Sequence, residues 1–121
     1  MIKTQNTKQY DLEDRTFQFS ERTRNYVKCL PKTISNFEYG KQLIRSSGSV
    51  AANYIEANES LGKKDFLMKS RICRKEAKES RLWLRLSEPV LEKQKEKVEL
   101  VQESFELTKI FGSILEKSKP F

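Results

Sequence analysis

The chain has 121 residues, which suits one compact domain because two separate cores would each be small. Charged residues make up 34% of the chain and hydrophobic residues 36%, with only 4 Gly and 3 Pro, a balance that favours helices with one buried face over a sheet-rich sandwich. The absence of histidine excludes the usual hydrolase, triad and His-metal sites, so we expect no enzyme, no catalytic residue, no metal and no cofactor.

Apolar residues recur every three or four positions along most of the chain, and the pattern breaks at Pro31, Gly62 and Pro89. We therefore expect a flexible N-terminus over residues 1–11, followed by one domain over residues 12–118. Its four helices are expected at residues 12–30, 35–58, 63–87 and 90–117. Because the connections are short, these helices should pack antiparallel, as an all-α, up-down-up-down four-helix bundle.

The spacing also predicts which residues of each helix are buried. In the first and third helices the apolar face is narrow, and in the third it passes through small residues such as Ser70, Cys73 and Ala77. In the second helix the predicted face includes Phe37 and Ile44. In the fourth, the apolar arc covers about half the circumference and is centred on the line Val98, Val101, Phe105, Thr108, Gly112 and Leu115. Such a wide arc indicates either extra burial within the chain or a subunit interface.

Polar side chains line one side of the second predicted helix. They can form a paired network at a helix contact or a subunit contact, or they can be a solvated surface. The residues are Gln42, Arg45, Ser49, Asn53 and Glu56.

The third predicted helix, residues 63–86, carries nine Lys and Arg but only three Asp and Glu, a charge of +6 against +7 for the whole chain. At 100° per residue the three acids, Asp65, Glu76 and Glu79, fall on one side. Seven cations, which we call the basic flank, fall on the other side: Lys64, Arg71, Arg74, Lys75, Lys78, Arg81 and Arg85.

Three interpretations of the basic flank are open. It can bind a polyanion such as RNA or DNA through phosphate contacts, it can pair with an acidic surface, or it can be a solvated face. The row Glu99, Glu103 and Glu106 of the fourth helix is the obvious acidic partner within the chain. No aromatic residue alternates with the cations along the helix, so the pattern favours contact with a nucleic-acid backbone over base stacking.

The two cysteines, Cys29 and Cys73, have no C-x-x-C spacing and lie within helical apolar patterns, which predicts reduced core thiols. Neither a signal sequence nor an apolar run of membrane-spanning length is present, so we expect a soluble, cytoplasmic protein without membrane contact.

The segment QLIRSSGSVAANYIEA at residues 42–57, followed by KDF at residues 64–66 and EAKESRLWL at residues 76–84, resembles the bacterial four helix bundle protein family. This family is also called the 23S ribosomal RNA intervening-sequence proteins, and the resemblance covers about residues 12–118. It implies a left-handed up-and-down bundle that assembles as a homo-oligomer, with the homopentamer as the expected state. A related branch, the accessory protein of diversity-generating retroelements, binds nucleic acid and a reverse transcriptase. The family's polar positions fall on the five residues of the second helix together with Glu76 and Glu79, which the resemblance makes a structural polar network.

Function within this family is largely unassigned. We therefore expect a non-enzymatic, homo-oligomeric bundle that binds structured RNA or DNA through the basic flank. The alternative is a protein-interaction adaptor or scaffold in which the basic flank makes ion pairs within the fold or the oligomer. An enzyme would need a carboxylate pair such as Glu76 with Glu79 or Asp65, or Ser49 as a nucleophile, and Ser49 has no histidine to activate it.

Overall fold

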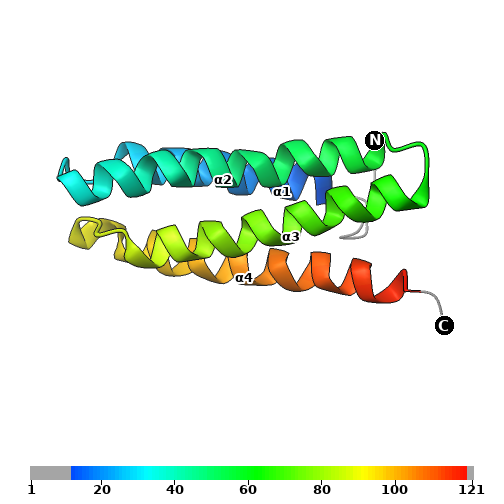
Figure 1. The fold of residues 1–121 in the computed structure, drawn as a ribbon. Helices are drawn as coiled ribbons and strands as arrows, with labels where there is room; N and C mark the ends of the chain where they lie inside the picture. The colour runs from blue at the N-terminus through cyan, green and yellow to red at the C-terminus, as the bar shows by residue number, and fades with distance from the viewer. Residues whose placement is uncertain (1–11, 120–121) are drawn as a thin grey trace, which may run out of the picture.

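A computed structural model describes residues 12–119 and consists of four long helices in chain order (Figure 1). The helices are α1 (Leu12–Lys28), α2 (Ile34–Asn58), α3 (Lys63–Leu86) and α4 (Gln94–Lys117), with a 3₁₀ turn, η1 (Leu91–Lys93), leading into α4. No strand occurs in this range. The predicted all-α four-helix fold is therefore confirmed.

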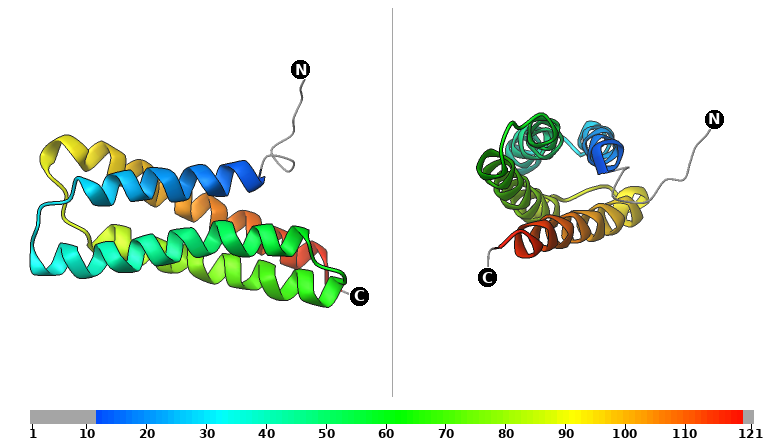
Figure 2. Two further views of the ribbon diagram at one scale, coloured as in Figure 1. Left: turned by 90° about the horizontal axis from the view of Figure 1, so that it is seen from above. Right: turned by 90° about the vertical axis from the view of Figure 1, so that its right-hand side faces the viewer.

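The chain reverses its direction at each of the three connections between the helices (Figure 1). Packing is closest between α2 and α3 and between α3 and α4, whereas α4 crosses α1 at an angle (Figure 2). No helix in the described range combines the length and the hydropathy that a membrane span requires. The left-handed sense of the bundle stays a prediction, and the predicted flexible segment 1–11 lies outside the described residues.

Two predicted helix ends were wrong by more than one residue, and proline explains the first. The first helix ends at Lys28 and not at residue 30, because Pro31 disfavours the helical conformation of Leu30. The fourth was predicted from residue 90, but Val90 follows Pro89 in an extended conformation, with φ −64° and ψ 161°. The chain then makes the 3₁₀ turn before α4 begins at Gln94.

The buried face of α4 differs from the predicted line. Val98 and Phe105, two members of that line, are exposed. The core positions are instead Leu100, Ser104, Leu107, Phe111 and Leu115, of which only Leu115 belongs to the predicted line. Because apolar residues cover half of this helix, spacing alone did not locate the centre of the buried stripe.

In α2 the predicted apolar face was also too wide. Phe37, Ile44 and Ile55 were expected inside but are exposed on the surface. The buried face of α2 contains several small or polar side chains: Asn36, Gly40, Ser46, Ser47 and Ala57.

Small residues allow the helices to approach closely. The Ser46 and Ser80 hydroxyls join α2 to α3 with an O···O distance of 2.7 Å in the buried interior. A Cβ atom on Gly40 would lie 3.0 Å from Cγ1 of Val27, so glycine permits the contact between α1 and α2 at this point. Small side chains along the middle of α2 therefore form close contacts with both neighbouring helices.

Asn36 ties together the two connections at one end of the bundle. Its Nδ2 donates to the carbonyl oxygens of Pro31 and Glu88, at 3.0 Å each, and its Oδ1 accepts from the backbone N–H of Glu88 at 3.0 Å. The side chain is almost fully buried. The loop before α2 is thereby fixed against the loop after α3.

We predict that Asn36→Ala lowers the free energy of unfolding by about 2–3 kcal/mol, because three buried hydrogen bonds of about 1 kcal/mol each are lost. Urea denaturation followed by circular dichroism measures the change. Asn25→Ala, at an exposed position of α1, should change it by less than about 0.5 kcal/mol. Equal effects of the two substitutions would contradict the role assigned to Asn36.

The two thiols lie in different environments, and the expectation of two core cysteines was wrong for Cys29, which is exposed where α1 ends. Cys73 is buried in α3, where its Sγ donates to the carbonyl oxygen of Val50 at 3.5 Å. Desolvation raises the pKa of the Cys73 thiol from its ordinary value of 9.0 to about 12. In the folded protein Cys73 therefore stays protonated at neutral pH.

We predict that a thiol reagent such as Ellman's reagent titrates one thiol per chain, Cys29, at pH 8 in the native protein and both after denaturation. The unfolded chain releases the Cys73 proton above pH about 9, so the stability linked to this thiol is present below that pH and is lost as the pH rises to about 12. The variant Cys29→Ser should show no fast reaction. Rapid labelling of that variant would contradict the burial of Cys73.

Candidate nucleic-acid interface

The basic flank is a property of α3, a regular helix of 24 residues. Lys64, Arg71, Lys75, Lys78 and Arg85 have exposed side chains, while Arg74 and Arg81 are half-buried against α4. The structure therefore keeps most of the predicted cations at the surface.

Few carboxylates neutralise the basic flank. Lys75 has one neighbouring carboxylate, since its Nζ lies 3.9 Å from Oε2 of Glu76. Within residues 12–119, no carboxylate oxygen lies within 4.0 Å of a charged nitrogen of the other six residues of the flank. Six cations of α3 thus lack a carboxylate partner in this range, and the four exposed ones, Lys64, Arg71, Lys78 and Arg85, are available to an external anion.

The acidic row of α4 is used elsewhere. Glu103 accepts two hydrogen bonds from Arg15 of α1, at 2.7 and 2.9 Å. Arg22 of α1 donates to Glu96 at 3.0 Å and to Glu99 at 2.9 Å. These bonds raise the pKa of both arginines. Most of the acidic row therefore faces α1 and does not neutralise the basic flank.

The third acid of the row, Glu106, is also engaged away from α3. Its Oε2 lies 3.6 Å from Nζ of Lys109, one turn further along α4.

Four of the cations share one repeat. Lys64, Arg71, Lys78 and Arg85 follow one another every seven residues, so neighbours are separated by about 10.5 Å along the helix and the row is about 31 Å long. A helix keeps such a row nearly straight, so the charges form a rigid line and not a flexible cluster.

An aromatic side chain lies beside the basic flank, which the sequence along α3 did not reveal. Phe105 of α4 has a 37% exposed side chain. The guanidinium carbon of Arg81 lies 4.9 Å from the centre of its ring, and Nζ of Lys109 lies at the same distance. Because two cations contact this ring, Phe105 holds positive charge in place.

Apolar side chains separate some of the cations of α3. Met68, Ile72 and Leu82 line a hollow of about 580 Å³ together with the stems of Arg71 and Lys78. The two sets share the outer face of α3, so the basic flank is a mixed surface of charge and hydrocarbon.

The predicted polar network exists in part, with Arg45 at its centre. Its Nη2 donates to Oε1 of Glu76 and to Oε1 of Glu79, both at 3.2 Å, and its Nη1 donates to Oε2 of Glu76 at 3.4 Å. Only 7% of the Glu76 side chain is exposed, so this carboxylate depends on Arg45 for its main partner. The cluster joins α2 to α3.

The other predicted members of the network do not join the Arg45 cluster. Asn53 donates to the carbonyl oxygen and the hydroxyl of Ser49 one turn earlier, at 2.9 Å each. Lys69, which the sequence analysis did not select, donates to Glu56 at 2.7 Å, and this bond raises the pKa of the lysine. Gln42 has no side-chain hydrogen bond to another part of the described chain.

Two carboxylates and the hydroxyl that an enzyme would need are hydrogen-bonded to neighbouring side chains. Glu76 and Glu79 share the guanidinium of Arg45, and Ser49 accepts from Asn53. Arg45, Glu76 and Glu79 therefore stabilise the contact between α2 and α3. The surface of α3 attracts anions through its cations.

Comparison with known proteins supports the resemblance seen in the sequence. The model of the family described as 23S rRNA-intervening sequence protein matches residues 8–113. A crystal structure of a protein of unknown function from the S23 ribosomal protein family of Bacteroides thetaiotaomicron VPI-5482 is similar, with a TM-score of 0.76 and 29% identity over 91% of this chain and 99% of that one. No protein of curated function matches the chain.

We predict that Arg45→Met lowers the free energy of unfolding by about 1–3 kcal/mol, because it leaves the nearly buried carboxylate of Glu76 without its main partner. Adding Glu76→Gln to this variant should restore part of the loss, since the unpaired charge is removed. Chemical denaturation measures both changes. Arg24→Met is the control, because Arg24 is exposed and bonds only to the adjacent Asn25. An Arg45→Met variant as stable as this control would contradict the structural role of the network.

Proposed function

The chain belongs to the 23S rRNA-intervening sequence protein family, and from this premise we propose that it is a non-enzymatic nucleic-acid-binding protein that holds structured RNA or DNA through the basic flank of α3. The observation that carries the proposal is the row of four exposed cations on α3, Lys64, Arg71, Lys78 and Arg85, which have no carboxylate partner in the described part of the chain. Phosphates are the natural partners of such a row, because each contact releases condensed counterions.

The proposed contact is with the nucleic-acid backbone. The cations form a straight row on a rigid helix, which suits a partner whose phosphates are themselves held in a fixed arrangement. Phe105 is engaged by Arg81 and Lys109, so it supports the cations and is not offered as a stacking platform. Binding should therefore depend on the shape and charge of the nucleic acid more than on its base sequence.

The proposed working form is a homo-oligomer in the cytoplasm, and the homopentamer is the state that the family resemblance implies. Several copies of the basic flank in one particle would convert a weak phosphate contact into a strong one by raising the effective concentration of the second contact. Exposed apolar side chains outside α3, such as Ile55 of α2 and Val98 of α4, supply surface that subunits could bury.

A role as an adaptor whose basic flank pairs with acids of its own chain has less support. The acids of α4 that could pair with the basic flank bond to α1 instead. They are Glu96, Glu99 and Glu103. Ion pairs between subunits are an outcome that the experiment below distinguishes.

We predict that the triple variant Arg71→Glu, Lys78→Glu and Arg85→Glu loses nearly all affinity for nucleic acid and keeps its helical content. All three side chains are exposed, so the fold does not depend on them. Fluorescence anisotropy with a labelled RNA hairpin and a DNA duplex, between about 50 and 200 mM salt, measures the affinity. For B-DNA the logarithm of the association constant should fall with that of the salt concentration, with a slope of about −0.9 for each phosphate contacted.

The matched control carries the same change of net charge on another surface, at Lys28, Lys32 and Lys41 of the α1–α2 region. This control should bind nucleic acid nearly as well as the native protein. Equal loss of affinity in both variants would mean that net charge alone explains the effect and would overturn the proposal. Retained affinity in the α3 variant would overturn it as well. Light scattering in the same buffers measures the mass of the oligomer. If the α3 variant forms a smaller particle than the native protein, and the native protein binds no nucleic acid at the lowest salt, then the basic flank serves contacts between subunits instead.

A further inference from the structure

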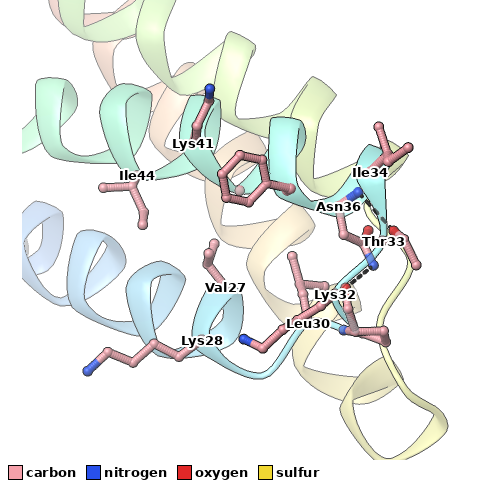
Figure 3. Close-up of a pocket in the computed structure, with 12 residues that line it drawn as sticks. Val27, Lys28, Leu30, Lys32, Thr33, Ile34, Asn36, Lys41 and Ile44 are labelled. Atoms are coloured by element: carbon pink, nitrogen blue, oxygen red, sulfur yellow. Dashed lines mark hydrogen bonds between the residues drawn. The ribbon is translucent and has the colours of Figure 1, made fainter.

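An apolar groove runs between α1 and α2, away from the basic flank. Figure 3 shows the groove at the end of the bundle where the two helices connect. It encloses about 690 Å³, and its walls carry Val27 and Leu30 from the α1 side and Ile34, Phe37 and Ile44 from α2.

The groove is lined by large side chains that the bundle itself does not bury. Ile34 is 87% exposed, Phe37 65% and Ile44 48%. Single exposed apolar residues are ordinary on a protein surface, but a contiguous apolar hollow is typical of an interaction site.

The groove continues along the same pair of helices. A second hollow of about 280 Å³ shares Ile44 with the first and is lined by Phe17 and Ser20 of α1 and by Gly48 of α2. From Ile34 to Gly48 the two hollows extend over about 21 Å of α2. That length equals about four turns of a helix, so the groove matches a helical segment better than a compact ligand.

The floor of the groove follows from the small residues of the interface. Gly40 lets α2 approach the Val27 side chain so closely that a Cβ atom at this position would lie 3.0 Å from Cγ1 of Val27. The bulky side chains of α2 then project on either side of the contact. The surface is concave because the centre is small and the walls are large.

Lysines edge the groove on both sides. Lys28 comes from α1 and Lys41 from α2, so they lie on opposite walls, and Lys32 lies in the connection (Figure 3). In the described residues, Lys28 and Lys32 have no carboxylate oxygen within 4.0 Å of Nζ, while Nζ of Lys41 lies 3.7 Å from Glu38 and 5.2 Å from the centre of the Phe37 ring.

The other charged groups that line the groove stand at its far end. They are Glu21 and Arg24 of α1, which carry opposite charges. The net charge along the groove is therefore positive, and it is concentrated at the end near the connection.

We propose that this groove binds an amphipathic helix of another protein, one that places apolar side chains into the groove and carries Asp or Glu along both edges. An apolar face fits the walls formed by Phe37 and Ile44, and acids on the two edges fit lysines that stand on opposite walls. This is the helix-in-groove mode of recognition, with anchors at every third or fourth residue. The proposal assigns to α1 and α2 a protein partner that the nucleic-acid contact of α3 does not require.

The test uses a fluorescein-labelled peptide of eighteen residues with Leu at successive i, i+3, i+4 and i+7 positions and Glu on both edges. A second peptide has the same apolar face and Lys in place of every Glu. Titration of the full chain, followed by anisotropy, should show saturable binding of the acidic peptide and no binding of the basic one. Equal binding of the two peptides would overturn the charge argument.

Variants of the protein locate the site. Phe37→Glu should weaken binding of the acidic peptide roughly tenfold or more, since a central aromatic anchor is lost. Leu61→Glu is the matched control, because Leu61 is a fully exposed apolar residue in the connection between α2 and α3, and it should bind as the native chain does. Peptide binding that survives Phe37→Glu would overturn the proposal.

A second pair of variants tests the lysines. Lys28→Glu with Lys32→Glu should weaken peptide binding, and Lys95→Glu with Lys117→Glu, at exposed positions of α4, should not. Equal weakening by the two pairs would overturn the proposal, because net charge alone would then explain it.

The remaining outcomes separate this groove from the α3 surface and from self-association. The variant with three Glu substitutions on α3 should bind the peptide normally, so failure of nucleic-acid binding leaves this test intact. If Phe37→Glu instead lowers the particle mass in light scattering and the native chain binds no peptide, the groove is an interface between copies of this chain and the proposal is wrong.

Discussion

Ion pairs between the first and last helices decide which charges of this protein are free. Arg15 holds Glu103 with two hydrogen bonds, and Arg22 holds Glu96 and Glu99, so α4 directs these acids toward α1. The side chains are partly exposed, and such pairs stabilise a fold only modestly. Their larger effect is positional. If the same acids faced α3, they would neutralise its cations, and the surface that we assign to nucleic acid would be an internal salt-bridge seam.

The width of each apolar stripe determined how well residue spacing located the buried side chains. In α3 the predicted apolar stripe is narrow, so Ser70, Cys73 and Ala77 were placed correctly. In α4 half of the circumference is apolar, so Phe105 was assigned to a core that it only borders. Periodicity gives the direction of a face, but the neighbouring helices decide how much of that face is covered. Asn36 continues the buried stripe of α2 through Gly40 and Leu43, but its hydrogen-bond partners had no signal in the sequence, because they are backbone groups of two loops that meet only in the folded chain.

In the candidate site, features of a single helix were predictable from the sequence, and contacts between helices were not. The order of cations along α3 is a property of one helix, and it was visible in the sequence, as was the row of polar residues on α2. The partners were not visible where they come from another helix. Phe105 and Lys109 join Arg81 across the contact with α4, and Lys69 reaches Glu56 from α3. The pairing of Arg45 with Glu76 was anticipated only because family resemblance marked both positions.

Two cationic surfaces on one small protein raise the question of how each selects its partner. Both attract anions at long range, so charge alone does not separate a nucleic acid from an acidic protein. The two surfaces differ in how cations and apolar side chains are arranged. In the groove, Phe37 and Ile44 stand between lysines on opposite walls, and a nucleic-acid backbone has no apolar face that would bury them. On α3, four cations follow one line with a regular spacing, which the phosphates of a nucleic-acid backbone can meet repeatedly. Discrimination therefore comes from the arrangement of hydrocarbon and charge, which the different packing of α2 against α1 and of α3 against α4 imposes.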